Sequence, residues 1–382
     1  MKILITSGRS FVALDFVRIL QNHEIFVQES QEEHICKKSC YVRETLHTKS
    51  PKYFYVEYKK SILKFVKKRK IDIIIPTCED IFYISQFRDE ITELWVKILS
   101  DSFEKLRLLH SKKEVLHLSE WLWISIPQTK EFKEKKILKT YINSYPELKY
   151  VVKPQFSRFA HFISSNAITW SIEIDDIKID TTNNSYLLQQ YIAGKHICSY
   201  SIFQDGNLVS HMAYKWLLNY KNGSTTYFET FESEEILNFV KNFSKKYDFS
   251  GQISFDFIIK QSGEIFLIEC NPRTTSGIHL LKQDQRFLET FEKFLLWKTY
   301  TPYILNKRFR AWFLGINFLY TFTWKKIWIW VKSLCTDVIF DKKDRGPFFS
   351  QFSLLKYYKR ISKERNITLS EVTSYDIEYD GI

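Results

Sequence analysis

The sequence predicts a mixed fold class, with an N-terminal α/β domain on a parallel sheet followed by an α+β region of antiparallel strands. The first residues, MKILITSGRSFVALDFVRILQNHEIFV, read as strand, turn, amphipathic helix and second strand, which is a β-α-β unit. The run IDIIIPT at 71–77 is apolar throughout, as expected for a parallel strand covered on both faces. From residue 149 onward, strand-like runs alternate with short turns.

Length, charge and cysteine usage limit the class of protein. A chain of 382 residues exceeds one ordinary core, so we expect two or three domains in a soluble protein. The net charge of +12 is compatible with nucleic acid, a membrane surface or a small anionic substrate as partner, but charge alone does not choose among them, and the Lys-rich stretches are read first as solvated helix faces. No nucleic-acid reader module is recognisable, so we expect no nucleic-acid partner. Six scattered cysteines and the absence of a secretory signal before MKILITSG predict a cytoplasmic location.

The N-terminal unit is expected to serve the substrate and not a dinucleotide. Its Ser7–Ser10 turn contains one glycine, whereas a dinucleotide fingerprint needs three. The strand at 71–77 leads into the polar loop Thr77–Asp80, at the edge where open α/β sheets bind their ligands. A Lys-rich helix is expected next, over Phe103–Trp123.

The region after Pro127 is expected to be rich in antiparallel hairpins. The turns QDGN and QSGE join successive pairs of strands, and Ser233–Tyr247 shows a capped helical stripe. The expected strands are Lys149–Pro154, Ser185–Ile192, His196–Phe203, Asn207–Tyr214, Gly251–Ile259 and Glu264–Asn271.

The last of these hairpins carries the residues that point most clearly to chemistry. Glu269, Asn271 and Arg273 follow an apolar strand at alternate positions, so they share one face. A turn near Ser262 would bring Asp256 of the preceding strand to the same face. Two carboxylates and a carboxamide are hard oxygen ligands that suit Mg²⁺, and the guanidinium suits transferring phosphate charge.

These residues, with ECNPR, resemble the metal-binding end of the ATP-grasp superfamily. The order of other motifs agrees with that resemblance, since YVVKP resembles the strand of the nucleotide-phosphate lysine, here Lys153. LLQQYIAG resembles the hinge that pairs with adenine, which implies Gln190, Tyr191 and Ile192 at the base. The resemblance implies a Rossmann-like pre-ATP-grasp domain at 1–105, linker helices and a nucleotide lobe at 106–192, a metal and catalytic lobe at 193–300, and an aromatic-rich C-terminal extension at 301–382.

Two departures from the family pattern bear on the nucleotide site. The stretch QFSRFAHF at 155–162 has no glycine where the family carries a flexible glycine-rich loop, and Ser157 and Arg158 are its expected phosphate contacts. His196 stands where a glutamate near the ribose is usual. Lys215 is a further candidate for contact with the phosphates or an acidic substrate.

The resemblance implies an ATP-dependent carboxylate–amine ligase that forms an amide through an acylphosphate. ATP and Mg²⁺ are the implied cofactors, with Mn²⁺ as an alternative metal. Asp256, Glu269 and Asn271 would hold the metal, and Arg273 would stabilise the transferring charge. The expected partners are a small carboxylate and an amine, with amino acids among the candidates.

Two alternatives stay open at the level of sequence. The enzyme would instead activate bicarbonate, or the chain would be a catalytically weak ATP-binding protein that docks on a membrane or partner. The segment Ala311–Leu334 is aromatic and apolar but is interrupted by Lys325 and Lys326, so we expect packed or interfacial helices and no membrane span. The sequence from Asp337 to Phe352 reads as strand followed by a polar turn, and Thr373–Ile382 reads as a strand-like end.

Overall fold

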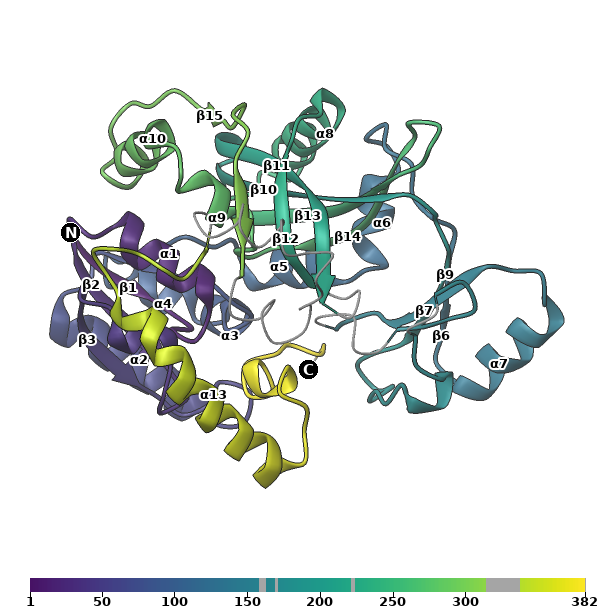
Figure 1. The fold of residues 1–382 in the computed structure, drawn as a ribbon, viewed down its shortest axis with the longest axis horizontal. Helices are drawn as coiled ribbons and strands as arrows, with labels where there is room; N and C mark the ends of the chain where they lie inside the picture. Colours follow the sequence, from purple (N-terminus) through teal and green to yellow (C-terminus); the bar gives the residue numbers. More distant parts are fainter. Residues whose placement is uncertain (158–162, 169–170, 221–223, 314–336, 382) are drawn as a thin grey trace, which may run out of the picture.

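The computed structural model describes the whole chain except residues 158–162, 169–170, 221–223, 314–336 and 382 (Figure 1). It combines one parallel sheet with two antiparallel sheets, so the predicted fold class is confirmed. Among the described residues, no helix is long and apolar enough to cross a membrane.

The N-terminal domain is a parallel sheet with helices packed around it (Figure 1). Its strand order is β3-β2-β1-β4-β5, and every neighbouring pair runs parallel. The side chain of Ser10 caps the first helix by accepting the Ala13 N–H at 3.2 Å. The strands are β1 (Lys2–Ile5), β2 (Glu24–Glu29), β3 (Val42–His47), β4 (Ile73–Ile75) and β5 (Lys97–Ile98), and the helices are α1 (Phe11–Ile19), α2 (Tyr55–Arg69), α3 (Ile81–Ser85) and α4 (Arg88–Thr92), with a 3₁₀ turn at Ile35–Lys38.

The stretch Phe103–Trp123, predicted to be helical, contains two helices, α5 (Phe103–His110) and α6 (Glu114–Ser119). Ser111 makes the break: its backbone is extended, and its hydroxyl accepts the N–H of Glu114 at 3.2 Å. The break turns the next residue, Lys112, inward.

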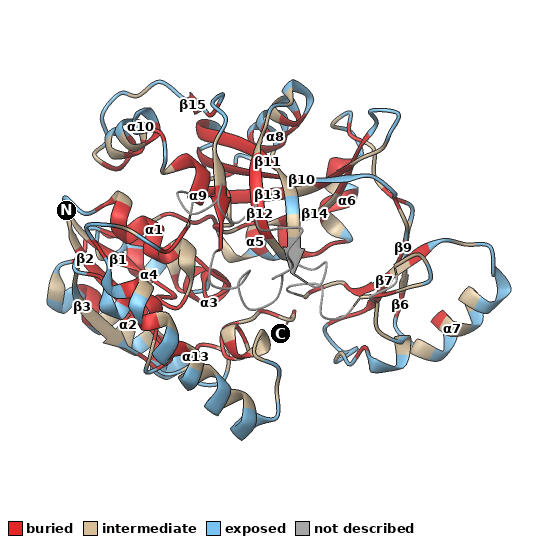
Figure 2. Cartoon of the chain, viewed as in Figure 1, coloured by how far each residue is buried: buried red, intermediate tan, exposed pale blue. Residues whose placement is uncertain are grey.

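A small four-stranded sheet, in the order β6-β9-β7-β8, forms the lobe that was predicted to bind the nucleotide, and it is called the nucleotide lobe here. It has its own core, and its outer helix carries only one buried residue, Leu138, so Figure 2 draws α7 mostly in the colours of exposed and intermediate residues. Its elements are β6 (Thr129–Phe132), α7 (Lys135–Ser144), β7 (Tyr150–Pro154), β8 (Ser164–Ser165) and β9 (Tyr186–Gln190), with a 3₁₀ turn at Ile174–Asp176.

The largest sheet is antiparallel, in the order β14-β13-β10-β11-β12-β16, and β15 joins it beside β11. The predicted QDGN turn is present, with Asp205 and Gly206 at positive φ (48° and 69°), as a tight hairpin requires. The predicted helix near Ser233 is capped by that residue, which accepts the Ile236 N–H. The elements are β10 (Lys195–Gln204), β11 (Asn207–Tyr220), β12 (Ser224–Phe231), α8 (Glu234–Lys246), β13 (Gly251–Ile259), β14 (Ile265–Asn271), α9 (Ile278–Leu281), α10 (Gln285–Leu295), β15 (Tyr303–Ile304) and β16 (Arg310–Trp312).

The C-terminal part returns to the N-terminal domain. α13 (Gly346–Arg365) begins inside the stretch that was expected to be a turn, and Pro347 occupies its first turn. The predicted strand at Thr373–Ile382 is wrong: a 3₁₀ turn at Glu371–Thr373 leads into turns and extended chain. Its backbone pairs with side chains of the N-terminal domain and not with a sheet edge. Most of the predicted aromatic segment Ala311–Leu334 lies outside the described residues.

Candidate functional site

The β13–β14 hairpin brings the predicted metal ligands together. Asp256 faces Glu269 directly in the strand register, and Ser254 faces Asn271. The carboxamide Nδ2 of Asn271 lies 3.5 Å from a carboxylate oxygen of Asp256, and Arg273 donates to Asn271 Oδ1 at 3.0 Å. The sequence prediction that all these side chains meet at one strand end is confirmed as geometry.

The two facing carboxylates repel one another in a partly enclosed site. Burial, followed by the charge of Glu269, raises the pKa of Asp256 to about 7. Burial also opposes ionisation of Glu269, but the cations Lys112 and Lys153 outweigh it and lower the pKa of that carboxyl. The pair therefore holds one firmly ionised carboxylate beside one whose charge is suppressed, which is the environment of a ligand site.

Two buried lysines face this carboxylate pair. Lys153, from β7, is 5% exposed, and burial lowers its pKa to about 8 while Glu269 opposes that shift. Lys112, also 5% exposed, lies with its Nζ 3.9 Å from Glu269, and burial likewise lowers its pKa. Lys153 was predicted as a site residue, whereas Lys112 was missed. The sequence signal that could have indicated Lys112 was the SKK run at 111–113, where the helical stretch breaks.

The loop after β7 contacts the same lysine. Lys112 Nζ donates to the carbonyl and to the hydroxyl of Ser157, at 3.0 and 3.1 Å. Ser157 therefore lies beside the site as predicted. Arg158, the other expected phosphate contact, lies outside the described residues.

A buried acid of the N-terminal domain approaches Arg273. Glu79, in the polar loop after β4, has an oxygen 3.7 Å from Arg273 Nε, and its side chain is fully buried. Its second oxygen accepts the backbone N–H of Tyr379 at 3.1 Å. The sequence pointed to this loop as a ligand edge, but neither acid in it was assigned a role.

The predicted hinge lies at the end of β9. The N–H groups of Gln190 and Tyr191 already donate to backbone carbonyls, at 2.8 and 3.0 Å. The N–H of Ile192 has no backbone partner among the described residues, and its side chain is buried. This leaves Ile192 as the hinge donor that a base could use.

His196 lies near the hinge on the site face of the large sheet. Its ring stacks on that of Trp216, with centroids 4.6 Å apart and planes 12° apart. The Trp216 indole N–H donates to Cys198 Sγ at 3.1 Å, and Cys198 faces Asp256 across β10 and β13. The stack therefore extends the face that carries Asp256.

The structure does not bring Lys215 to this group. Lys215 and Phe257 both face Ile197, so they lie on the sheet face opposite to Asp256. Its Nζ pairs with Glu229 at 3.0 Å. Two arginines, Arg308 and Arg310, pair with the same carboxylate.

The residues present fit a magnesium ion. Two carboxylates and a carboxamide form the hard oxygen donor set that Mg²⁺ takes from protein, and a cation between them would relieve the repulsion that raises the pKa of Asp256. In the described part of the chain there is no cluster of three or more His, Cys, Asp or Glu residues arranged for a metal ion. The set therefore suits a metal that shares its coordination with phosphates and water.

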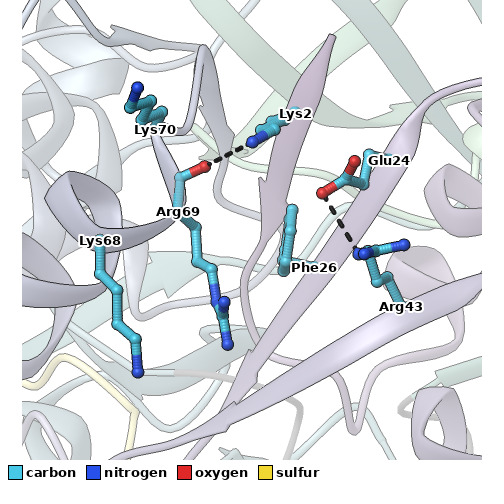
Figure 3. Close-up of a pocket in the computed structure, with 7 residues that line it drawn as sticks. All are labelled: Lys2, Glu24, Phe26, Arg43, Lys68, Arg69 and Lys70. Atoms are coloured by element: carbon cyan, nitrogen blue, oxygen red, sulfur yellow. Dashed lines mark hydrogen bonds and ion pairs between the residues drawn. The ribbon is translucent and has the colours of Figure 1, made fainter.

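A separate cationic cavity of about 280 Å³ lies at the other edge of the parallel sheet (Figure 3). Several of its charges are already paired: Lys2 donates to the Arg69 carbonyl at 3.1 Å, and Arg43 pairs with Glu24 at 3.3 Å. None of the predicted site residues lines it. The lining residues are Lys2, Glu24, Phe26, Arg43, Lys68, Arg69 and Lys70.

Comparison with known proteins agrees with this geometry. Residues 116–277 match the family model of the ATP-grasp domain, and no curated protein matches the sequence. The N5-carboxyaminoimidazole synthetase of Staphylococcus aureus is similar at a TM-score of 0.61 and 13% identity, over 82% of each chain. An ADP complex of an N5-carboxyaminoimidazole ribonucleotide synthetase gives 0.64 and 11%, over 90% of each chain. The biotin carboxylase of Campylobacter jejuni gives 0.57 and 13%, over 76% of this chain and 70% of that one.

At these identities the solved structures establish the fold, and the family model establishes the domain. The chain therefore carries an ATP-grasp domain at residues 116–277.

Proposed function

We propose that this protein is an ATP-dependent ligase that joins a carboxylate to an amine through an acylphosphate. One observation carries the proposal: the paired carboxylates Asp256 and Glu269 face two buried lysines at the end of an ATP-grasp sheet. Two buried cations beside a carboxylate pair of which one member is held ionised suit a polyphosphate with its metal, because the phosphates would add partners for the lysines and the metal would add one for the carboxylates.

The nucleotide would lie between the two sheets. The backbone N–H of Ile192 would donate to the base of the nucleotide, and Lys153 and Lys112 would neutralise its phosphates. Lys112 already holds Ser157, so it would also position the start of the loop over the phosphates. Magnesium held by Asp256, Glu269 and Asn271 would screen the charge of the β- and γ-phosphates.

The chemistry then takes two steps. An oxygen of the substrate carboxylate attacks the γ-phosphorus, the bond from that phosphorus to the β–γ bridging oxygen breaks, and ADP leaves. An amine nitrogen next attacks the acyl carbon, inorganic phosphate leaves, and the nitrogen loses a proton to give the amide. Arg273, placed by its bond to Asn271, would stabilise the negative charge that develops in both steps.

The proposal is tested by ADP release from Mg-ATP with pooled small carboxylates, amino acids and other amines. We expect release to require one acid together with one amine, and to stop in Glu269→Gln. If the protein binds Mg-ATP but no combination of acid and amine produces ADP, the ligase assignment is contradicted.

The second candidate is activation of bicarbonate. It is favoured by the similarity to biotin carboxylases, one of which was solved with MgADP and a bicarbonate anion at 13% identity and a TM-score of 0.61. In that case bicarbonate alone would release ADP without any organic acid. The same assay separates the two candidates, because the compound that must be present for ADP release identifies the phosphate acceptor.

A further inference from the structure

The C-terminal segment, defined here as residues 371–381, lies between the parallel sheet and the nucleotide lobe (Figure 1). The letter C in Figure 1 marks its end. Residues along its whole length have hydrogen-bond partners in distant parts of the chain, among them Val372, Asp376, Glu378, Tyr379 and Asp380. The segment is therefore built into the molecule and is not a loose tail.

Its first anchor is a buried ion pair with Arg9. The guanidinium of Arg9 reaches Asp376 through both terminal nitrogens, at 2.5 and 3.0 Å, and also binds Glu29. Ser30 adds a hydroxyl donor to Asp376 at 2.8 Å, and the side chains of Arg9 and Asp376 are 2% and 5% exposed. A buried bidentate contact of this kind fixes both the position and the orientation of the Asp376 carboxylate.

Its second anchor is Lys52. The ammonium of Lys52 lies 3.3 Å from Glu378 and 2.9 Å from Asp380, so one cation holds two carboxylates of the segment. The carbonyl of Glu378 accepts the hydroxyl of Tyr83 at 2.8 Å. These contacts hold the chain on both sides of Tyr379.

Tyr379 is the point at which the segment enters a core. Its side chain is 2% exposed and stacks on Phe82 at 4.9 Å, with Phe103, His110 and Phe156 around it. Its ring thus joins the N-terminal domain to the α5 region and to the loop after β7.

The end of the segment reaches the nucleotide lobe. Asn184 donates its carboxamide to the Asp380 carbonyl at 3.3 Å, and also bonds Phe156 on both its N–H and its carbonyl. A pocket of about 150 Å³ remains between them, and Ser157 and Glu378 are among the residues that line it. The segment therefore borders the loop that follows the phosphate lysine.

The backbone of Tyr379 connects the segment to Arg273 through Glu79. Its N–H donates to one oxygen of Glu79 at 3.1 Å, and the other oxygen of Glu79 lies 3.7 Å from Arg273 Nε. Glu79 is fully buried, so its position is set by these neighbours. Arg273 is also bonded to Asn271, a predicted metal ligand.

We propose that the C-terminal segment is a positioning element of the phosphoryl-transfer site: Tyr379 fixes Glu79, and Glu79 orients the guanidinium of Arg273. The statement about phosphoryl transfer rests on the proposed function, whereas the positioning of Arg273 stands by itself. Asp376 and Lys52 act at a distance by holding the segment in register, so that the N–H of Tyr379 meets Glu79.

The positioning can be measured without any substrate. In the full chain labelled at arginine with ¹⁵N, the exchange rate and shift of the Arg273 Nε–H signal report its surroundings. The variants are Glu79→Gln, Asp376→Asn and the double variant. The matched control is Asp175→Asn, which removes an exposed carboxylate on the far side of the nucleotide lobe.

We expect Glu79→Gln and Asp376→Asn each to shift the Arg273 signal and speed its exchange, while Asp175→Asn leaves it unchanged. The double variant should add nothing to Glu79→Gln alone, because both changes act through the same contact. Effects that simply add, or an unchanged signal in Asp376→Asn, would overturn the proposal.

A second variant covers the case in which Asp376→Asn does not fold. Lys52→Met removes the second anchor, which holds Glu378 and Asp380, and an unchanged Arg273 signal in it would overturn the proposal. Where ligase turnover is found, Asp376→Asn should lower kcat and leave the KM for ATP unchanged, as expected of positioning. Failure to find turnover would bear on the proposed function alone, because the Arg273 signal needs no substrate.

Discussion

Two groups of buried charges in this protein differ in how far they are satisfied. At the carboxyl edge of the parallel sheet, Arg9 meets Glu29 and Asp376 at hydrogen-bond distance. At the end of the β13–β14 hairpin, the ion pair of Lys112 with Glu269 is 3.9 Å long, and the carboxylates of Asp256 and Glu269 face each other.

From this difference we expect the Arg9 group to stabilise the fold and the Asp256–Glu269 group to bind a ligand. Charges that are buried with complete hydrogen bonding are stable as they stand, and removal of one partner is costly. Charges held close together with incomplete pairing have shifted pKa values and gain most from a bound ion. The first group is therefore expected to control stability, and the second to control turnover.

The largest effect is expected from breaking the first group. Arg9→Met leaves Glu29 and Asp376 buried side by side and should lower the free energy of unfolding by about 3–5 kcal/mol. Urea unfolding measures this. Lys59→Met is the matched control, since its partner Glu90 is 45% exposed, and it should cost less than about 1 kcal/mol. Equal losses in the two variants would contradict the comparison.

The pH dependence of stability sharpens the same contrast. Burial alone would raise the pKa of Glu29, but the charge of Arg9 lowers it from an ordinary 4.5 to about 2. Because the folded pKa lies below the unfolded one, the stabilisation is complete above about pH 4.5 and is lost as the pH falls towards 2. It amounts to roughly 3 kcal/mol. Urea midpoints between neutral pH and pH 3 should fall in the wild type more steeply than in Glu29→Gln.

Breaking the second group should affect chemistry and not folding. Glu269→Gln should lower ADP release at least about a hundredfold, since even residues that only support a metal ligand cost up to that much. Its melting temperature should stay close to that of the wild type. Glu264→Gln, in the same hairpin and 46% exposed, is the control and should keep full turnover. A large loss of stability in Glu269→Gln would make that carboxylate part of the fold.

The smallest expected effects are on the affinity for Mg-ATP, and they distinguish Lys153 from Lys215, both of which the sequence offered as phosphate contacts. Lys153→Met should weaken Mg-ATP binding about tenfold, the effect of losing one charged hydrogen bond in a buried site. Lys215→Met should leave the affinity unchanged, because Lys215 pairs with Glu229 on the opposite sheet face. Isothermal titration measures both. Comparable losses would place Lys215 at the nucleotide.

Local patterns predicted much of the fold. The β-α-β start, the hairpin turns and the stripe of the helix after Ser233 were all read correctly, because each depends on residues close in sequence. The break within the helical stretch Phe103–Trp123 was not predicted, and the predicted strand at the C-terminus is wrong. At both places a side chain or a distant domain supplies the hydrogen bonds that a regular element would otherwise make.

The sequence by itself determined that Asp256, Glu269 and Asn271 meet at one strand end, since alternation and a tight turn fix that geometry within a single hairpin. Only the tertiary structure decided that Lys112, Glu79 and Tyr379 approach the same group. They come from a helix break, a loop of another domain and the last residues of the chain, and no local periodicity relates such segments. Their meeting depends on how the separate cores pack, which is a property of the whole chain.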